Sequence, residues 1–344
     1  MSKPGAVMLS EIAEIPQMLD GISSAMEKNQ SAKELYRTHN FTNVVILARG
    51  TSDNAAHYLK YLLETQMGLP VGLASPSAAT MYSPKFHYEK TLLIAISQSG
   101  QSTDLISFAK AAKDGGAYLL SITNAPDSPL AKLSDLHLPI HAGPELAVPA
   151  TKSYVGQLMV SYLLVMMWSN QKPDTQSIIS AAKEIAADQD TYIDFAKNIK
   201  LEKPIYVLGR GFSYPNAKEF ALKLQETCLI PVQGMSSSDF LHGPIASLNS
   251  EAQVVFIASQ HLPESSFGEA PNRVRAVTGR VFWIGNPTQA SGGDIVLKTA
   301  PNGSELTASI TDAIAFQKVT HHLATTNGLN PDTPEGLSKV TITR

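Results

Sequence analysis

The segment ISQSGQSTD, residues 96–104, places hydroxyl and amide side chains around one glycine, directly after the apolar run TLLIA. Six of its side chains carry a hydroxyl or an amide, and those of Ser97, Gln98, Ser99, Ser102 and Thr103 are candidates to donate hydrogen bonds to a bound anion. A helix that begins near Ser102 would add free backbone amides and the positive end of its dipole, and Gly100 would permit the tight turn before it. The segment lacks lysine and arginine. We therefore predict a phosphate site built from neutral donors, with a polar loop capped by Ser102 as the alternative.

Other phosphate-binding motifs fit this sequence less well. No Walker A pattern occurs, and GRGFSY, residues 209–214, supplies only the first two glycines of a dinucleotide-binding fingerprint. The next predicted strands lack a ribose-binding acidic residue, which argues against a nicotinamide dehydrogenase. The turn ARGTSD, residues 48–53, follows another apolar run, so Thr51 and Ser52 are expected to open onto the same sheet edge as residues 96–104.

Strands and helices alternate in two parts of the chain that correspond with an offset of 161 residues. VVILARGTSDNAAHYLKYLLE from Val44 matches IYVLGRGFSYPNAKEFALKLQE from Ile205, with Arg49 falling on Arg210. Two further pairs of apolar runs begin at residues 92 and 254 and at residues 117 and 280. Alternating strands and helices require crossover connections, and hence a mostly parallel sheet covered on both faces. We therefore predict an α/β fold with two tandem halves.

The polar helical stretch 171–203 precedes the second copy of the first strand and is expected to hold the boundary between the halves. We predict four segments: an N-terminal helical segment over 1–40, a first domain over 41–195, a second domain over 196–326 and an ordered tail over 327–344. The apolar run from Val155 to Trp168 is interrupted by Gln157 and Ser161 and is too short for a bilayer span. It is predicted to be a core or interface helix.

The composition excludes several classes of protein. The 344 residues, 43% hydrophobic and 17% charged, suit a globular chain with two cores, and a net charge of −3 gives no basic surface for nucleic acid. Cys228 is the only cysteine, which excludes an internal disulfide and a multi-cysteine zinc site. His321 and His322 diverge too far on a helix to form a metal pair. With no targeting segment or membrane span recognised, a cytoplasmic protein that needs no metal or cofactor is expected.

Six short motifs, taken in order, resemble a known family: ARGTS (48–52), SQSGQSTD (97–104), AGPELAVPATK (142–152), ALKLQE (221–226), DFLHGP (239–244) and LSKVT (337–341). They are similar to motifs of the tandem SIS-domain sugar-phosphate enzymes. The most similar patterns are the isomerase half of glutamine:fructose-6-phosphate aminotransferase and the stand-alone amino-sugar-phosphate deaminases. The resemblance implies two SIS domains, each a flavodoxin-like three-layer sandwich with a parallel sheet flanked by helices on both faces.

The resemblance also implies roles for single residues. It assigns the phosphate to side chains on two turns: Ser97, Gln98, Ser99 and Ser102, with Thr51 and Ser52 nearby. It implies that Val148 contacts the sugar through its backbone. Glu226 matches the residue that moves a proton between C1 and C2, and Lys223 matches its companion. His242 matches the ring-opening histidine, which the neighbouring subunit supplies in that family. Lys339, in the tail that would complete the active site, matches the lysine that lies against the open-chain sugar.

These roles suit sugar-phosphate chemistry, although most of the residues also have a structural explanation. A histidine can open a hemiacetal, a partly buried carboxylate can remove the proton beside a carbonyl, and a lysine can stabilise the developing charge. Lys223 and Glu226 could instead form a surface ion pair, three residues apart on a helix. His242 could cap a loop, and Lys339 could be a solvated terminal charge. Glu145 is expected to shape the pocket rather than to transfer protons.

We expect a homodimer with shared active sites that acts on a sugar phosphate. Because the first domain begins near the N-terminus, no glutaminase is expected, and deamination of glucosamine 6-phosphate to fructose 6-phosphate and ammonia is favoured. Another phosphosugar aldose-ketose isomerisation and a fructosamine-6-phosphate deglycase are alternatives. A non-catalytic sugar-phosphate sensor is the third choice, because a sensor has no use for Glu226, His242 and Lys339 together.

Three departures from the aminotransferase pattern leave the substrate open. Arg49 stands where the better-known relatives have a cysteine, Gln101 replaces a glutamate, and Pro149-Ala150 replaces a small Ala-Ser pair. Arg49 could reach a ligand or pair with a neighbour. Because Arg210 occupies the corresponding position in the second half, a structural role is favoured for Arg49.

Overall fold

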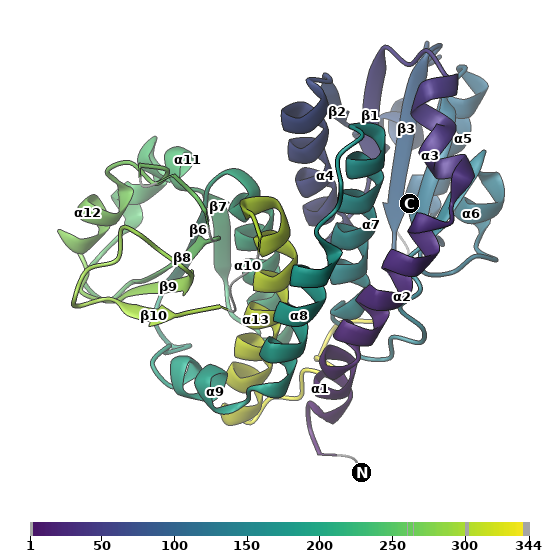
Figure 1. Ribbon diagram of the computed structural model, residues 1–344. Helices are drawn as coiled ribbons and strands as arrows, with labels where there is room; N and C mark the ends of the chain where they lie inside the picture. The colour runs from purple at the N-terminus through teal and green to yellow at the C-terminus, as the bar shows by residue number, and fades with distance from the viewer. Residues whose placement is uncertain (1–2, 260, 264, 300–302, 340–344) are drawn as a thin grey trace. The chain divides into compact units, whose positions relative to one another are not determined.

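A computed structural model describes residues 3–259, 261–263, 265–299 and 303–339 (Figure 1). The chain forms two compact units. The first-sheet unit comprises residues 17–145, 152–175 and the tail from residue 338, and the second-sheet unit comprises residues 1–16, 146–151 and 176–337. The domain limits expected at 40/41, 195/196 and 326/327 remain predictions. Residues 1–2 and 340–344 of the predicted terminal segments lie outside the described residues.

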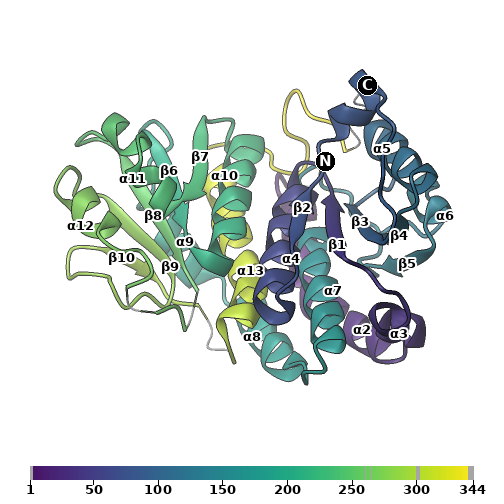
Figure 2. The same cartoon turned by 90° about the horizontal axis from the view of Figure 1, so that it is seen from above.

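The first-sheet unit holds five parallel strands in the order β2-β1-β3-β4-β5. The strands are β1 (Asn43–Leu47), β2 (Val71–Leu73), β3 (Thr91–Ser97), β4 (Tyr118–Thr123) and β5 (Leu136–Pro139). The helices are α2 (Ile15–Glu27), most of which belongs to this unit, α3 (Gln30–Thr38), α4 (Thr51–Met67), α5 (Thr103–Asp114), α6 (Pro129–Leu133) and α7 (Lys152–Trp168), with a π-helical turn η1 (Ala78–Tyr82). Figure 2 shows α4 and α7 together on one face of the sheet, with α5 and α6 on the other.

The strands of the first sheet are apolar runs because helices cover both of their faces. All seven residues of β3 are buried. Leu93 of β3 belongs to the same buried cluster as Leu105 and Phe108 of α5. On the other face, α7 is buried at every position except Met167. The apolar run from Val155 is therefore a core helix of this unit.

The second-sheet unit also holds five parallel strands, in the order β10-β9-β8-β6-β7. The strands are β6 (Ile205–Gly209), β7 (Val232–Ser236), β8 (Gln253–Ala258), β9 (Val281–Gly285) and β10 (Ile295–Leu297). The helices are α1 (Ala6–Ala13), α8 (Thr175–Ala187), α9 (Asp190–Ala196), α10 (Tyr214–Cys228), α11 (Ser237–Leu241), α12 (Ala270–Arg275) and α13 (Glu305–Thr326), with short helical turns η2 (Gly211–Ser213) and η3 (Pro244–Ser247). α10 packs against α13, and Phe240 of α11 and Val274 of α12 share a core cluster with Trp283.

The two sheets have the same topology. In each, the strand that comes second along the chain lies at one edge, followed by the first, third, fourth and fifth strands. This is the flavodoxin-like order, so the predicted fold class is confirmed. The strands expected from residues 44, 92, 117, 205, 254 and 280 are all present. No helix in the described ranges is both long and apolar enough to cross a bilayer.

A buried polar network closes the carboxyl end of the second sheet. Ser213 Oγ donates to Ser259 Oγ at 2.8 Å, and Ser259 Oγ donates to Asp312 Oδ2 of α13 at 2.8 Å. All three side chains are buried. Burial raises the pKa of Asp312 to about 6, although hydrogen bonds from Ser259 and Thr299 oppose the shift. The Asp312 carboxylate therefore lies at the carboxyl end of β8, the position in the second sheet that corresponds to residues 96–104 in the first.

Asp312→Asn is expected to remove a pH-dependent loss of stability. Because the pKa of Asp312 is higher in the folded chain than in the unfolded chain, the folded state loses stability as the pH rises from about 4 to about 6. Asparagine does not titrate, and its amide oxygen still accepts the hydrogen bond from Ser259. In urea titrations, the unfolding free energy of the variant relative to the native chain should rise by about 1 kcal/mol between pH 5 and pH 7.5. The same difference at both pH values would contradict this assignment.

Candidate functional site

The carboxyl end of β3 leads into a tight turn that only glycine fits. β3 ends at Ser97, and Gly100 adopts a φ of 61°, in the left-handed region that side chains disfavour. A Cβ atom on Gly100 would also lie 2.7 Å from Ser128 Cβ, at the start of α6, and would overlap the Ser128 hydroxyl. Backbone conformation and packing therefore both fix this turn, residues 97–102, which we call the β3 loop.

Hydrogen bonds hold the β3 loop against the next strand and helix. The carbonyl oxygen of Gln98 accepts from the amide of Asn124 at 3.1 Å, and that of Gly100 accepts from the amide of Leu130 at 3.2 Å. The amide of Gly100 donates to Ser97 Oγ at 3.1 Å. Because these carbonyl oxygens are engaged by protein donors, they do not face the space where an anion would bind.

The donors of the β3 loop remain available. α5 begins at Thr103 with Ser102 as its N-cap residue, as expected, but the Ser102 side chain accepts no capping hydrogen bond. Ser99 Oγ accepts from the amide of Gln101 at 3.3 Å, which leaves the Ser99 hydroxyl hydrogen free to donate. The Gln98 side chain has no hydrogen-bond partner in the described part of the chain. The capped-loop explanation is therefore the weaker one, and a phosphate would meet hydroxyl, amide and helix-terminus donors here.

The turn after β1 leaves the same edge of the sheet, because β1 pairs with β3 in parallel along its length. Thr51 is the first residue of α4. Buried Ser52 accepts a hydrogen bond from Gln157 Nε2 at 2.9 Å, so its own hydroxyl hydrogen points elsewhere. Arg49 Nε donates to Asp104 Oδ2 at 2.9 Å and ties this turn to α5. The structure thus brings Thr51 and Ser52 together with the β3 loop.

Lys339 forms an ion pair with Glu145 in the first-sheet unit. The Nζ of Lys339 lies 2.8 Å from Glu145 Oε2, and the Glu145 side chain is fully buried. Ser153 donates its amide to Glu145 Oε1 at 2.9 Å and its hydroxyl to Oε2 at 2.7 Å. Burial raises the pKa of Glu145, but the Lys339 ammonium and these hydrogen bonds outweigh burial, so the pKa lies below its ordinary value. Glu145 is therefore an ionised anchor for Lys339, which is not a solvated terminal charge.

Val148 belongs to the second-sheet unit. Its amide donates to the carbonyl oxygen of Asp332 at 2.9 Å, which leaves its carbonyl oxygen as the backbone group that can face a sugar hydroxyl. The Asp332 carboxylate accepts from the amide of Met8 at 2.8 Å, and Glu11 Oε1 accepts from the amide of Ala147 at 3.3 Å. Groups from both ends of the chain therefore fix the backbone around Val148.

Lys223 lies between two carboxylates of α10. Its Nζ is 3.3 Å from Glu219 Oε1 and contacts Glu226 Oε2. The side chains of Lys223 and Glu219 are fully buried, whereas 22% of the Glu226 side chain is exposed. Burial lowers the pKa of Lys223, but the carboxylates of Glu219 and then Glu226 outweigh burial and raise it. The pair is therefore not a surface ion pair, and Glu219, one helical turn before Lys223, is a partner that the sequence analysis missed.

His242 is the C-cap residue of α11, and its amide donates to the carbonyl oxygen of Asp239 at 3.0 Å. Its side chain is exposed and makes no hydrogen bond within the described ranges. No contact joins it to Lys223 or Glu226 among the residues described. The structure therefore gives His242 a fixed backbone and an accessible imidazole. It does not bring His242 together with Glu219, Lys223 and Glu226, which we call the α10 cluster.

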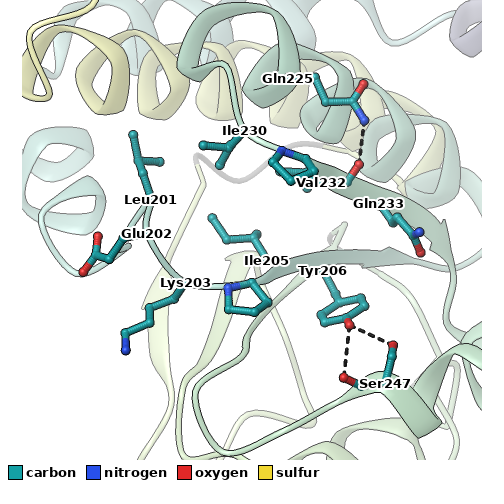
Figure 3. A pocket seen from close by; sticks show the side chains of 12 residues that line it. Leu201, Glu202, Lys203, Ile205, Tyr206, Gln225, Ile230, Val232, Gln233 and Ser247 are labelled. Carbon is teal, nitrogen blue, oxygen red and sulfur yellow. Dashed lines mark hydrogen bonds between the residues drawn. The ribbon is translucent and has the colours of Figure 1, made fainter.

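An open groove in the second-sheet unit lies at the amino ends of β6 and β7, and Figure 3 shows Ile205, Tyr206 and Val232 lining it. Tyr206 Oη shares a hydrogen bond of 2.8 Å with Ser247 Oγ, and Gln225 Nε2 donates to the carbonyl oxygen of Val232 at 2.6 Å. None of the predicted site residues lines this groove. Parallel sheets bind ligands at the opposite, carboxyl edge, so the groove is not the predicted site. The described residues contain no group of three His, Cys, Asp or Glu side chains that could hold a metal ion.

The chain matches the SIS domain family over residues 39–167 and 199–275. A curated relative is the isomerising glutamine–fructose-6-phosphate aminotransferase of Thermococcus kodakarensis, with 30% identity over 352 aligned residues. The alignment covers 96% of this chain and 57% of the relative. The chain therefore spans little more than half the length of that relative.

Solved structures share the fold. The C-terminal domain of glucosamine-fructose-6-phosphate aminotransferase from Francisella tularensis matches with a TM-score of 0.84 and 25% identity, over 95% of this chain and 98% of that one. Glucosamine-6-phosphate deaminase from Thermotoga maritima matches with a TM-score of 0.76 and 19% identity, over 98% of this chain and 100% of that one, which shows likeness of fold alone. With its two parallel sheets and its family match over more than half of its length, the chain belongs to the SIS domain family.

Proposed function

We propose that this chain binds a sugar phosphate at the β3 loop and deaminates it. The observation that carries the proposal is the β3 loop, where Gly100 fixes the turn, the carbonyl oxygens of Gln98 and Gly100 are engaged and the Ser102 hydroxyl is not used for capping. Several neutral donors and a helix N-terminus in so small a space suit a phosphate group. The proposed phosphate ligands are Ser97, Gln98, Ser99 and Ser102, with Thr51 and Ser52 beside them.

The proposed substrate is glucosamine 6-phosphate, and the products are fructose 6-phosphate and ammonia. The names of the aminotransferase relative and of the aminotransferase domain with the same fold, which refer to fructose 6-phosphate and to glucosamine, support this choice. His242 of the partner subunit would move the proton from the hydroxyl on C1 to the ring oxygen and so open the ring. Glu226 would take the proton from C2 and return it to C1, while O1 gains a proton and the nitrogen loses one, which gives a ketose imine. Water would then add to the carbon-nitrogen double bond, and ammonia would leave.

The environments of the proposed catalytic residues support these roles. The Glu226 carboxylate is held by buried Lys223 and is partly exposed, so a substrate can approach it. The Lys339 ammonium is held by buried Glu145 and would stabilise negative charge that develops on the open-chain sugar. The carbonyl oxygen of Val148 would accept a hydrogen bond from a sugar hydroxyl. The role of His242 across a subunit boundary requires a homodimer, which we therefore also propose.

Isomerisation of another phosphosugar between aldose and ketose, without nitrogen chemistry, is the second candidate. Ring opening and proton transfer between C1 and C2 need the same His242 and Glu226, but the substrate carries a hydroxyl on C2, so the ketose forms directly and no imine is hydrolysed. Release of ammonia from glucosamine 6-phosphate separates them. A fructosamine-6-phosphate deglycase would release a substituted amine instead. A sensor is the least favoured, because it needs no buried lysine held between two carboxylates.

Gly100→Ala is expected to weaken binding of fructose 6-phosphate. A side chain at this position would be strained and would overlap Ser128, so the β3 loop must shift. The Kd measured by isothermal titration should rise about tenfold or more. Gly68→Ala is the matched control, because Gly68 has a φ of 64° with open space around it, and its Kd should stay at the native value. A native Kd for Gly100→Ala would place the phosphate elsewhere.

Glu226→Gln is expected to lower the rate of ammonia release from glucosamine 6-phosphate about 100-fold or more, because an amide cannot accept the C2 proton. Glu269→Gln serves as the control, since Glu269 is exposed and makes no capping hydrogen bond at the start of α12. Circular dichroism would verify that both variants fold. Release of ammonia by Glu226→Gln at the native rate would remove Glu226 from the mechanism.

Glu145→Gln is expected to lower kcat about tenfold or more, because Lys339 loses the charge that holds it in position. Lys339→Met should lower kcat at least as much. If Glu145 acts through Lys339, the double variant should be no slower than Lys339→Met alone. The four proteins would be compared by ammonia release under saturating glucosamine 6-phosphate. Losses that multiply in the double variant would show that the two residues act independently.

A further inference from the structure

Arg49 lies at the edge of the β3 loop with most of its hydrogen-bond donors unused. Its Nε donates to Asp104 Oδ2 at 2.9 Å. The Arg49 side chain is 51% exposed, whereas the Asp104 side chain is only 3% exposed. The two terminal nitrogens of Arg49 have no hydrogen-bond partner in the part of the chain that the structure describes. The buried Asp104 carboxylate therefore orients the Arg49 guanidinium, and the remaining donors of that guanidinium are available.

The position of Asp104 directs Arg49 toward the phosphate site. Asp104 is the second residue of α5, in the helical turn whose amides would face a phosphate at the β3 loop, and its Oδ1 accepts from the amide of Leu105 at 2.9 Å. A carboxylate in this turn favours the helix but would repel a phosphate bound beside it. Arg49 neutralises that carboxylate and leaves two donor nitrogens at the same turn. The pair can therefore attract an anion that Asp104 alone would repel.

The corresponding arginine of the second sheet is arranged differently. Arg210 follows β6 as Arg49 follows β1, but its Nη1 lies 3.5 Å from Ser236 Oγ, at the end of the edge strand β7. Arg49 instead pairs with a carboxylate on the helix that follows the central strand β3. The match of the two arginines in sequence therefore does not extend to their contacts, and a shared structural role does not account for Arg49.

We propose that Arg49 is a further ligand of the substrate phosphate and gives this site a cationic donor. The inference rests on the proposed function, because it requires a phosphate at the β3 loop. The planar guanidinium would donate from its terminal nitrogens to two phosphate oxygens while Nε stays on Asp104. Binding would then depend on a charge-assisted contact as well as on the neutral donors, which favours a dianionic phosphate ester over an uncharged sugar.

Isothermal titration of fructose 6-phosphate into the native chain and into Arg49→Met tests this proposal. The variant should raise the Kd about 10-fold to 100-fold, the usual effect of losing a charge-assisted hydrogen bond. It should also reduce the dependence of the Kd on sodium chloride, because one cation fewer meets the phosphate. Arg210→Met is the matched control and should leave both quantities at their native values.

Arg49→Gln keeps a donor for Asp104 but removes the charge, so it should fold and should lose affinity like Arg49→Met. If Arg49 serves only to hold Asp104, Arg49→Met will lower the midpoint of thermal unfolding, and both variants will keep the native Kd and its native salt dependence. That result would overturn the proposal. A native chain that binds no fructose 6-phosphate would overturn the proposed function together with this inference. A native chain that binds it, with Arg49 variants that bind equally well, would overturn this inference alone.

Discussion

The first-sheet unit depends on how a fully buried parallel strand passes into a helix within a few residues. β3 is covered by helices on both faces and ends at Ser97. The chain then turns sharply at Gly100, which packs against Ser128. The amides of Asn124 and Leu130 satisfy the carbonyl oxygens of Gln98 and Gly100 in this turn. What remains at the edge of the sheet is a set of donors: hydroxyls, a side-chain amide and the start of α5. The preference for an anion thus follows from satisfying the backbone, before any charged side chain is considered.

The second sheet shows that the same topology does not by itself make an open site. Its strands follow the same order, and Ser213 and Ser259 stand at the carboxyl ends that correspond to the turns of the first sheet. There the hydroxyls donate in series to Asp312, so the acceptor comes from the chain and not from a ligand. Burial keeps that carboxylate close to neutral at mildly acidic pH, with a pKa of about 6. One sheet edge is therefore closed internally, and the other keeps its donors.

Much of this arrangement could be predicted from local patterns in the sequence. Apolar runs that repeat at a nearly constant offset predicted both parallel sheets, and a polar run after an apolar one located the β3 loop. Contacts between distant segments could not be predicted, because Lys339 and Glu145 are 194 residues apart and neither segment reveals that Glu145 is buried. Glu219 could have been found, since it lies four residues before Lys223 on a helix. Arg49 was interpreted through its counterpart Arg210, and sequence correspondence gave no indication of the carboxylate on α5.

The buried charges of Lys223 and Glu145 are better explained by positioning than by stability. Removing an ion pair from water costs about as much as its attraction returns, so an apolar side chain would serve a core equally well. In the α10 cluster, a fully buried ammonium holds the partly exposed carboxylate of Glu226. Around Glu145 the signs are reversed, and a fully buried carboxylate holds the partly exposed ammonium of Lys339. In both places one buried charge fixes an accessible group of opposite sign, which is the arrangement that an acid-base reaction requires of its side chains.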